Sequence, residues 1–505
     1  MGHDKIKDVV IVGGGTAGWI AAAAMSKLLP PSINIKLIES DAIGTVGVGE
    51  ATIPQIIRLN GILGLDEREF LRETKATFKL GIEFNNWGQK GDSYLHTFGD
   101  AGINLSNLQF HHYWLRHQAA QDEASENGLW DYSLHHRAAY AGKFAHMGKV
   151  GNTSMTGLAY AYHFDAGLYA KFLRRYAEAN GVTRIEGRVV DTTLDDENGF
   201  IRAVTLESGE SVSGDLFVDC SGFRGLLIGQ ALGVDYHDWS EWLPCNRAVA
   251  IPCETTSPLL PYTKATAHDA GWQWRIPLQH RTGNGHVFCD KFTDIDSATD
   301  TLLQNLDGKP TAEPKKLSFT TGRRAEFWHK NCVSLGLASG FLEPLESTSI
   351  HLIQSNVSRL IELFPDQGFS ASNIAEYNRI VAKEYETVRD FLILHYFRTD
   401  RDDTAFWRYC KNMDVPDSLT HKIELFENGG RLYRDPDDIF RESSWVQVMV
   451  GQGIKPKGYH AMADRITDTQ LSDFMGSVDK IIGKAVSPLP SHKDYIQSYI
   501  GADLA

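Results

Sequence analysis

The chain has 505 residues, of which 42% are hydrophobic and 23% are charged, and its formal net charge at pH 7 is −14. A chain of this length can bury a core large enough for two or three domains. The negative charge opposes binding to nucleic acid or to anionic lipid, while it leaves room for a local basic pocket. We therefore expect no nucleic-acid partner.

The cysteines are scattered, without a C-x-x-C pair. They are Cys220, Cys245, Cys253, Cys289, Cys332 and Cys410. This spacing fits reduced thiols in a cytoplasmic enzyme better than a disulfide framework or a zinc site, so no metal is expected. The apolar run at 17–25 is too short to cross a bilayer, and no signal-peptide pattern precedes it. We expect a cytoplasmic protein with no membrane partner.

A strand, a helix and a second strand are predicted at the N-terminus. Residues 8–12 are a β-branched run, residues 17–29 an alanine-rich helix, and residues 35–38 a strand that ends at Glu39. This βαβ unit is typical of dinucleotide-binding folds.

The turn after the first strand has the pattern G-x-G-x-x-G, formed by Gly13, Gly15 and Gly18. Glycines here allow a tight turn, and the following helix can direct backbone N–H groups at a pyrophosphate. Glu39 lies where a carboxylate is expected to accept a hydrogen bond from a ribose hydroxyl. The alternative is a glycine turn that serves only helix–strand packing. It is weaker because the glycine motif, its place between a strand and a helix, and Glu39 at the end of the second strand coincide.

Helical periodicity continues farther along the chain. Residues 66–84 predict a helix with Asp66 as its N-cap and Lys79 near its end. Residues 166–179 predict another helix, and the region beyond about residue 360 is mainly helical. Strands and hairpins that rejoin the first sheet are predicted at 182–190, 201–206 and 211–218.

The stretch at 215–225, DLFVDCSGFRG, predicts a strand that enters an Asp-x-Ser-Gly turn. It resembles the second flavin-contacting stretch of flavoprotein monooxygenases, which favours FAD over NAD. We predict an α/β fold: an FAD-binding Rossmann-like core of the flavoprotein monooxygenase type with an interleaved, mainly helical substrate-binding region. The FAD-binding module is expected to be discontinuous, at 1–50, 150–240 and 310–360. The substrate-binding module is expected at 51–149, 241–309 and 361–505.

Five stretches resemble the flavin-dependent halogenases of the tryptophan-halogenase family, and the resemblance runs over most of the chain. They are GGGTAG at 13–18, GVGEATIP at 47–54, FKLGIEF at 78–84, WQWRIP at 272–277 and FLEPLEST at 341–348. The fourth and fifth are the most specific, although Trp272 and Trp274 also suit a strand core. The resemblance implies an enzyme that uses reduced FAD, O₂ and chloride or bromide to make hypohalous acid, which is guided to an electron-rich arene.

The resemblance makes Lys79 and Glu346 the catalytic residues. An ammonium can position an electrophilic halogen, and a nearby carboxylate can accept the proton that the substituted ring loses. The plain structural alternatives are a solvated lysine near a helix C-terminus for Lys79 and a carboxylate at a helix N-terminus, near Ser347, for Glu346.

The halide site of the family corresponds to the backbone amides of Thr348 and Ser349, beside the flavin. Position 349 is typically glycine in the best-known members, so Ser349 bears on halide affinity or on the preference between chloride and bromide. The remaining implied FAD contacts are Gly13, Gly15, Thr16, Ala17, Gly18, Glu39, Ala42, Gly49, Glu50, Val189, Leu337, Pro344, Leu345 and Ile350.

For the substrate, His96-Thr-Phe98 resembles the His-Pro-Phe stretch that sandwiches an indole, with threonine in place of proline. Core packing for Phe98 and a loop histidine for His96 are the alternatives. Tryptophan-specific members hold the amino and carboxyl groups with a Tyr-Tyr pair and a glutamate, whereas this chain has FRESSWVQ at 440–447, including Trp445. Without those partners, the amino and carboxyl groups of a bound tryptophan would be poorly solvated, which disfavours free tryptophan as the substrate. We expect an indole-type arene; other electron-rich arenes and larger conjugates stay open.

Two other functions fit a flavin site: an FAD-dependent aromatic hydroxylase, and a non-catalytic flavin-binding or redox-sensing protein. The stretch EPLEST at 343–348 argues against the hydroxylase, and Lys79 together with Glu346 argues against the non-catalytic protein. The chain has one dinucleotide fingerprint, so a separate flavin reductase is expected to supply FADH₂. A homodimer is suggested only by analogy with the family.

Overall fold

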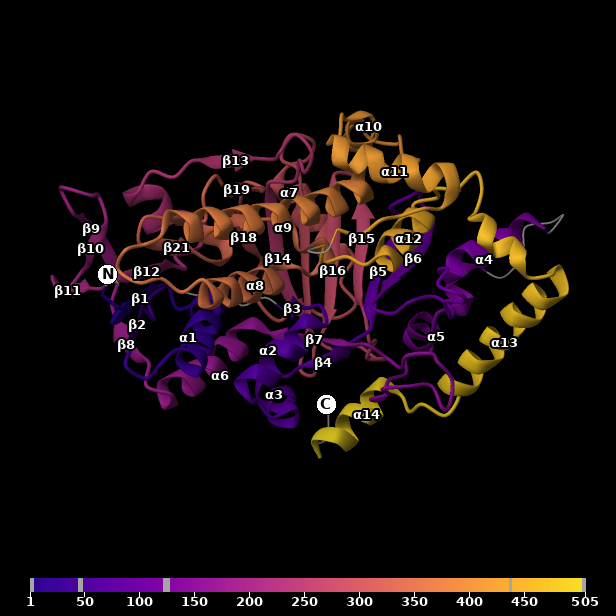
Figure 1. Ribbon diagram of the computed structural model, residues 1–505, viewed down its shortest axis with the longest axis horizontal. Coiled ribbons are helices and arrows are strands. Elements are labelled where there is room, and N and C mark those ends of the chain that lie inside the picture. The colour runs from indigo at the N-terminus through magenta and orange to yellow at the C-terminus, as the bar shows by residue number, and fades with distance from the viewer. Residues whose placement is uncertain (1–3, 44–48, 121–127, 436–437, 502–505) are drawn as a thin grey trace. The chain divides into compact units, whose positions relative to one another are not determined.

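The computed structural model describes residues 4–43, 49–120, 128–435 and 438–501 (Figure 1). It divides into two compact units, each assembled from three segments of the chain. The first unit comprises Met1–Ala76, Phe164–Ser240 and Ser318–Glu386, and the second comprises Thr77–His163, Glu241–Leu317 and Thr387–Ala505.

A six-stranded sheet forms the centre of the first unit, in the order β20-β21-β12-β1-β2-β8. Its strands are β1 (Asp8–Val12), β2 (Asn34–Glu39), β8 (Thr183–Glu186), β12 (Leu216–Asp219), β20 (Trp328–His329) and β21 (Cys332–Ser334). All neighbours are parallel except β20 and β21. The central strand is hydrophobic and fully buried from Val9 to Ile11, as expected where helices cover both faces of a parallel sheet.

Five helices accompany this sheet. They are α1 (Thr16–Leu28), α2 (Gln55–Leu63), α3 (Glu67–Thr74), α6 (Ala166–Ala179) and α8 (Ser349–Glu362). Helix α1 packs against both α6 and α8. The predicted β1-α1-β2 unit and the helix at 166–179 are confirmed.

The first unit extends to residue 76, beyond the boundary at residue 50 that the sequence suggested. The hydroxyl of Tyr169 on α6 donates to the side chain of Asn60 on α2 at 3.2 Å. The Phe70 ring on α3 meets Tyr169 edge-on, with centroids 5.6 Å apart. These contacts attach α2 and α3 to the first unit. By the same division, residues 361–386 also belong to it.

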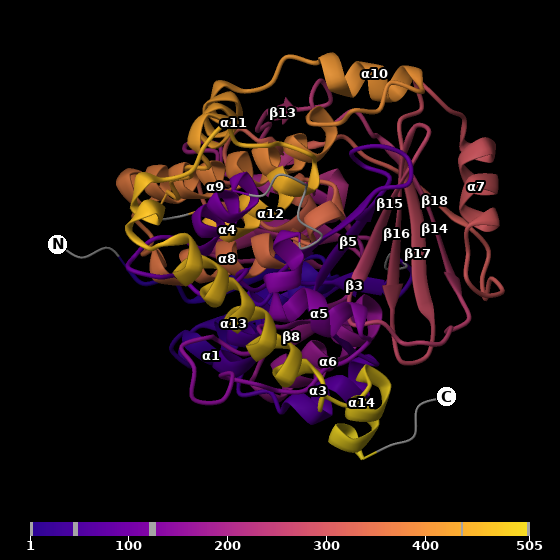
Figure 2. The ribbon, with the colours of Figure 1, turned by 90° about the vertical axis from the view of Figure 1, so that its right-hand side faces the viewer.

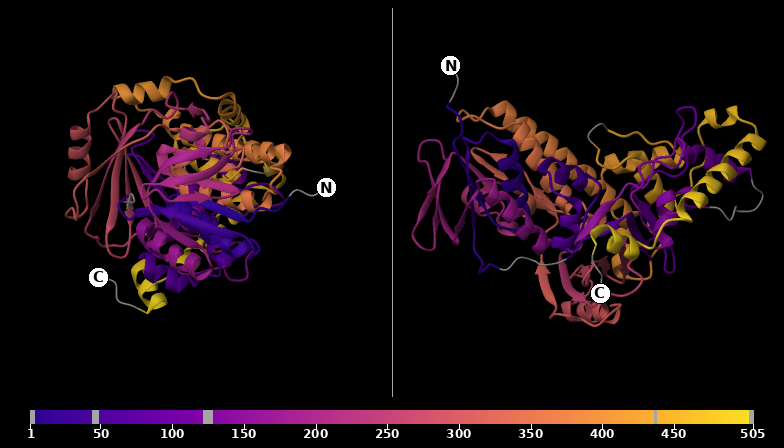
Figure 3. Two further views of the ribbon diagram at one scale, coloured as in Figure 1. Left: turned by 90° about the vertical axis from the view of Figure 1, so that its left-hand side faces the viewer. Right: turned by 90° about the horizontal axis from the view of Figure 1, so that it is seen from below.

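Two small antiparallel sheets complete the first unit. One is β9 (Val189–Leu194), β10 (Ile201–Leu206) and β11 (Ser211–Ser213), whose strands lie side by side (Figure 3). The other is β13 (Tyr236–Asp238), β19 (Gly322–Arg324) and β22 (Gly340–Phe341). Of the predicted segments, only β8 and β12 join the large sheet.

The second unit contains a seven-stranded sheet, in the order β18-β14-β17-β16-β15-β5-β6. Its strands are β5 (Gly81–Asn85), β6 (Ser93–Thr97), β14 (Arg247–Cys253), β15 (Thr263–His268), β16 (Gly271–Pro277), β17 (Thr282–Phe288) and β18 (Lys315–Ser318). Helix α7 (Ile295–Gln304) lies beside β14 and β17 (Figure 2). Strand β6 is an edge strand. The size of this sheet was not anticipated from the sequence.

The last part of the chain is helical, as predicted. Its helices are α9 (Ala371–Phe397), α10 (Ala405–Asn412), α11 (Asp417–Gly429), α12 (Glu442–Gly451), α13 (Asp468–Val486) and α14 (His492–Ile500). The second unit also has α4 (Phe110–Ala119) and α5 (Leu134–Tyr140). None of the described helices is long and apolar enough to span a membrane.

Lys79 lies in a strand, so its predicted place near a helix end is wrong. Asp66 caps α3 as expected, accepting from the Glu69 N–H at 2.8 Å. The helix ends at Thr74 because Lys75 takes a left-handed conformation, with φ of 53°. Residues Thr77–Lys79 then form β4, which pairs antiparallel with β7 (Ala161–Asp165).

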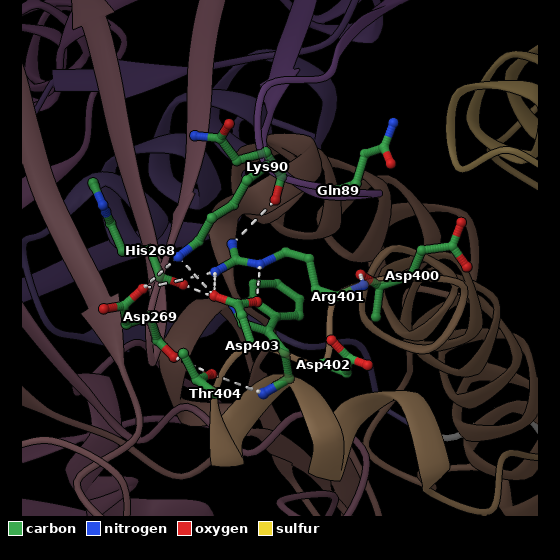
Figure 4. A network of polar contacts seen from close by, with 12 residues as sticks. Gln89, Lys90, His268, Asp269, Asp400, Arg401, Asp402, Asp403 and Thr404 are labelled. Carbon is green, nitrogen blue, oxygen red and sulfur yellow. Dashed lines mark hydrogen bonds and ion pairs between the residues drawn. The ribbon is translucent and has the colours of Figure 1, made fainter.

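An ion pair between the buried Arg401 and the partly exposed Asp403 lies where two loops of the second unit meet (Figure 4). The Arg401 guanidinium contacts the Asp403 carboxylate through two nitrogens, at 3.0 and 3.1 Å, and stacks 4.5 Å from the Trp407 ring centroid. It also donates to the Asn86 carbonyl at 3.1 Å, and Lys90 contacts Asp403 at 2.8 Å. Arg401 thereby holds the loop after α9 against the loop between β5 and β6.

Candidate active site

The glycine turn after β1 has the close approaches that a dinucleotide-binding turn needs. Gly13 has φ of 116°, and a Cβ there would lie 2.2 Å from the Cys220 carbonyl oxygen. A Cβ on Gly18 would lie 1.9 Å from the Gly13 carbonyl oxygen. A Cβ on Gly15 would meet no atom of the described chain within 4 Å. The backbone at Gly15 therefore borders open space, where a pyrophosphate can approach.

The N-terminus of α1 is suited to bind an anion. Helix α1 begins at Thr16, and its N-cap residue, Gly15, supplies no side-chain hydrogen bond. Its first turn contains no acidic residue, and the first N–H with an intrahelical partner is that of Trp19, which donates to Gly15 at 3.1 Å. The N–H groups of Thr16, Ala17 and Gly18 thus precede the helix ladder, as in a phosphate-binding turn. These residues fit the phosphates of FAD.

Glu39 ends β2 as predicted, and its carboxylate already has protein partners. Arg184 Nε donates to Oε1 at 2.6 Å, and Trp19 Nε1 donates to Oε2 at 3.3 Å. A Cβ on Gly14 would lie 1.6 Å from Oε2. Glu39 thus lies directly over the glycine turn, in place to act on a nucleotide. Only a glycine at 14 leaves it that room.

The Asp-x-Ser-Gly turn lies against the same glycines, because Gly13 touches Cys220. Asp219 is fully buried. One carboxylate oxygen accepts from the Ser221 N–H at 3.0 Å, and the other from the N–H groups of Leu227 and Ile228 at 2.8 and 2.9 Å. Asp219 therefore fixes the loop after β12, a role that the motif alone did not reveal.

The other residues implied in FAD binding are distributed over the first unit. Leu337 is half-exposed in a turn whose Gly336 would place a Cβ 2.8 Å from Ala17 Cβ, so this turn borders the α1 N-terminus. Burial raises the pKa of Glu50, in β3 (Gly49–Ala51), to about 7. The remaining members are Ala42 in an exposed turn, Val189 in β9, Pro344 and Leu345 in a short 3₁₀ turn, and Ile350 in α8. Gly47 and Val48 of the second stretch lie outside the described residues.

Glu346 and the proposed halide residues occupy one short segment. Glu346 ends the 3₁₀ turn Pro344–Glu346 and is 1% exposed. Ser347 is left-handed, with φ of 59°, and α8 begins at Ser349 with Thr348 as its N-cap. The Thr348 hydroxyl is buried and has no hydrogen-bond partner among the described residues. An acceptor such as a halide would satisfy this donor beside the helix N-terminus.

Lys79 is completely buried, which overturns the alternative of a solvated lysine. Its ammonium lies 5.3 Å from the centroid of the half-buried Phe98 ring. The next residue, Leu80, accepts the Phe98 N–H at 3.1 Å through its carbonyl oxygen. The structure therefore brings Lys79 together with Phe98, one of the three aromatic residues that the sequence assigned to the substrate. Lys79 belongs to the second unit and Glu346 to the first.

A neutral histidine that the sequence analysis missed supports the lysine strand. The hydroxyl of Thr77 on β4 donates to the Pro277 carbonyl at 2.7 Å, so it accepts from His163 Nδ1 at 3.0 Å. His163 Nε2 then accepts from the Thr263 hydroxyl at 2.9 Å. Burial, with the nearby charge of Lys79, holds the pKa of His163 well below its usual value. Its proton thus stays on Nδ1, and β4 stays tied to β16.

Three aromatic side chains, those of His96, Phe440 and Trp445, lie around Phe391 on α9. No sequence pattern indicated the role of Phe391 beyond its helical register. The Phe391 ring lies 5.5 Å from His96, 4.8 Å from Trp445 and 3.8 Å from Phe440, with which it stacks. His96 and Trp445 are buried. His96 and Trp445 thus both contact Phe391. No group of three or more potential metal ligands occurs among the described residues.

Comparisons with known proteins show the family to which the chain belongs. A family model described as tryptophan halogenase matches residues 8–468. The tryptophan 6-halogenase ThaL of Streptomyces albogriseolus is 35% identical, over 99% of each chain. Among solved structures, the flavin-dependent halogenase Xcc4156 of Xanthomonas campestris is 48% identical with a TM-score of 0.94, over 99% of each chain. The flavin-dependent halogenase BrvH of Brevundimonas sp. BAL3 is 43% identical with a TM-score of 0.93, over 98% of this chain and 99% of that one.

The glycine turn, the α/β core and these similarities define a flavin-dependent halogenase, an enzyme that uses reduced FAD, O₂ and a halide ion. The chain belongs to the tryptophan-halogenase family. The predicted Rossmann-like FAD-binding fold is thereby confirmed. The hydroxylase and the non-catalytic flavin protein are not favoured.

Proposed function

We propose that this halogenase acts on an electron-rich, indole-type arene other than free tryptophan, with Lys79 and Glu346 as its catalytic residues. The observation that carries the proposal is the complete burial of Lys79 beside the Phe98 ring. Burying an ammonium is costly, so a completely buried lysine is a candidate functional group. A lysine held against an aromatic face is instead suited to present a halogen electrophile to a ring.

Bound FADH₂, with O₂ and a halide, supplies the oxidised halogen. The residues that would hold the flavin are those of the glycine turn, the α1 N-terminus and the loop fixed by Asp219. The Lys79 ammonium donates a hydrogen bond to the halogen species and so directs its electrophilic atom. The Glu346 carboxylate accepts the proton that leaves the substituted ring carbon. The buried Thr348 hydroxyl and the α8 amides near Ser349 support the halide site.

The substrate class follows from the aromatic cluster. The names of relatives such as ThaL specify tryptophan as their substrate. In this chain Phe440 is 4% exposed and stacked on Phe391, so it cannot hydrogen-bond an amino or carboxyl group. An arene without the amino-acid head avoids leaving such charges unsolvated. His96, Phe98 and Trp445 are the proposed contacts to its ring.

A separate flavin reductase is the proposed source of FADH₂, because the chain carries only one dinucleotide fingerprint. In this proposal the first unit binds FAD and the second unit supplies the aromatic contacts to the arene. The six free cysteines, all buried, support a cytoplasmic location. A homodimer remains a prediction, which sedimentation velocity can check.

The test is mass spectrometry of aerobic reactions with FAD, a flavin reductase, NADH and bromide or chloride. Indole, tryptophan and other electron-rich arenes serve as substrates. The wild type should give a brominated or chlorinated product with indole but little with tryptophan, and Lys79→Ala and Glu346→Ala should give none. Lys264→Ala is the matched control, because Lys264 also lies over a ring, that of Tyr262, at 5.9 Å. A gain of one oxygen without halide would contradict the proposal, as would unchanged activity of Lys79→Ala.

A further inference from the structure

One side chain covers the open edge of the strand that carries the aromatic residues. Strand β6 is the last strand of its sheet, so alternate backbone groups point away from β5. An uncovered edge leaves such groups to solvent or to another partner. At Thr97, the end of the strand, the partner is the side chain of Gln447 on α12.

The side-chain amide of Gln447 makes the two hydrogen bonds to the Thr97 backbone that a neighbouring β-strand would otherwise make. Gln447 Oε1 accepts from the Thr97 N–H at 2.9 Å, and Gln447 Nε2 donates to the Thr97 carbonyl at 3.4 Å. Nε2 also lies 3.2 Å from the carbonyl oxygen of Gly99. Gln447 is 3% exposed and Thr97 is 1% exposed. One buried amide therefore satisfies both backbone groups of Thr97 and reaches past Phe98.

This pairing bears directly on the residues assigned to the arene. His96 and Phe98 flank Thr97: His96 lies within β6, and Phe98 follows directly after the strand ends. On the other edge, Phe98 N–H donates to Leu80, the residue after Lys79, at 3.1 Å. The segment 96–99 is thus held between the lysine strand on one edge and α12 on the other.

We propose that Gln447 is a positioning residue that sets the placement of His96 and Phe98 relative to Lys79, and so determines which arene is accepted and which ring carbon reacts. This inference rests on the proposed function, in which those two side chains contact the arene. Sub-ångström placement matters because small shifts of a reacting centre change rates by orders of magnitude. A buried amide with several partners resists such shifts.

The identity of residue 97 supports this role. The stretch resembles a His-Pro-Phe segment with threonine in place of proline. Proline has no N–H and could not donate to Gln447 Oε1. The threonine and the glutamine thus act as a pair in this chain, since each completes the hydrogen bonding of the other.

The experiment compares Gln447→Met, Thr97→Pro and the double variant with the wild type. Methionine has a similar length but cannot pair with the strand, and proline removes the N–H. Calorimetric binding of indole and of a bulkier indole derivative to the protein is measured first. The ratio of kcat/KM for these two arenes and the ratio of halogenated regioisomers are then measured. Both ratios are independent of the fraction of folded enzyme, so a purely structural role would not change them.

We expect Gln447→Met to weaken indole binding and to change both ratios by about tenfold or more. Thr97→Pro should act in the same direction, and the double variant should be little worse than either, because both changes remove the same pairing. Gln452→Met is the matched control. Gln452 is also buried next to α12, but it donates to the His395 carbonyl at 2.7 Å and not to β6.

The outcomes distinguish a failure of the positioning role of Gln447 from a failure of the proposed substrate class. Unchanged ratios and binding in Gln447→Met, or equal changes in Gln452→Met, would overturn the positioning role, as would a wild type that binds no arene. If the wild type binds indole but yields no halogenated product, the proposed substrate class fails. In that case the binding contrast between the two glutamine variants still supports or overturns the positioning role.

Discussion

The ammonium of Lys79 lies 5.3 Å from the centre of the Phe98 ring, and the two residues are joined through the Phe98 N–H and the Leu80 carbonyl. A cation over an aromatic face is stabilised by the ring quadrupole, by up to about 2 kcal/mol when desolvated. Phe98 therefore has two functions in the proposed mechanism. It contacts the arene, and it holds the ammonium in place.

Replacing Phe98 with leucine should lower kcat/KM for halogenation by about 5- to 30-fold, which corresponds to the loss of about 1–2 kcal/mol. The variant keeps an apolar side chain, so folding should change little. Steady-state kinetics with indole and bromide checks this prediction. Phe98→Tyr, which keeps a ring, should retain most of the activity. A leucine variant as active as the wild type would show that the ring has neither function.

Two glycines of the same turn should respond differently to substitution by alanine. Gly13→Ala should destabilise the protein, because φ of 116° is unfavourable for alanine and its Cβ would overlap the Cys220 carbonyl. Gly15→Ala should leave the apoprotein stable, since its Cβ meets no described atom within 4 Å. That methyl would instead occupy the space proposed for the pyrophosphate. Its FAD affinity should fall by at least about tenfold.

Thermal unfolding of the apoproteins and quenching of FAD fluorescence measure the two effects separately. Gly209→Ala, at a surface turn with φ of 89° and no neighbour within 4 Å, is the control for backbone strain without a nearby ligand. It should cost some stability and no FAD affinity. If Gly15→Ala binds FAD like the wild type, the pyrophosphate does not lie there.

Local sequence patterns were sufficient for part of this structure. The β1-α1-β2 unit and the start of α8 near Ser347 follow from neighbouring residues, because turn glycines and caps act over a few positions. The end of α3 did not, because one left-handed residue, Lys75, interrupts a pattern that otherwise continues as a helix. The burial of Lys79 and its contact with Phe98 depend on strand pairing.

The contact between Thr97 and Gln447 joins positions 350 residues apart. No periodicity or motif encodes such a contact, and neither residue type is distinctive by itself. The neutral state of His163 is similar, since it depends on Thr77, Pro277 and Thr263, which meet only in the folded chain. Motifs thus predict the reacting groups, whereas the contacts around them could be seen only in the structure.

Folding stability should fall as the pH falls below 6.5. Burial lowers the pKa of His135 and of His492 to about 4. Each Nε2 accepts a backbone N–H, from Ala159 at 2.8 Å and from Phe78 at 3.1 Å, so neither imidazole can gain a proton without losing that bond. Between pH 6.5 and about 4 the unfolded chain therefore binds more protons. Each such histidine then removes up to about 1.4 kcal/mol per pH unit.

Other buried histidines add to this effect. The pKa values of four more are lowered to about 3 or 4, for His111, His112, His136 and His286. The pKa of Glu50, raised to about 7, and the raised pKa values of Asp92 and Asp438 act in the opposite direction, but these carboxyl groups are fewer than the histidines. Urea denaturation at pH 7.5, 6.5 and 5.5 measures the trend. A free energy of unfolding that is constant or rises toward pH 5.5 would contradict it.

Replacing Arg401 should cost much more stability than replacing a nearby surface arginine. Its side chain is only 2% exposed and contacts both Asp403 and the Trp407 ring. Arg401→Ala removes the stacking on Trp407 and the charged hydrogen bonds to the partly exposed Asp403, so we expect a loss of about 2 kcal/mol. Arg401→Lys should recover little, because an ammonium cannot make the two parallel contacts.

Arg398→Ala is the comparison. Arg398 contacts Glu427 at 2.8 Å, but both side chains are about a third exposed, at 36% and 31%. Solvent screens such a pair, so its loss should cost under about 1 kcal/mol. Urea denaturation of the three variants measures these differences. Equal losses for Arg398→Ala and Arg401→Ala would mean that the loop contacts of Arg401 do not stabilise the second unit, because Arg401 contacts the loop between β5 and β6 through Asn86, whereas Arg398 contacts Glu427 on α11.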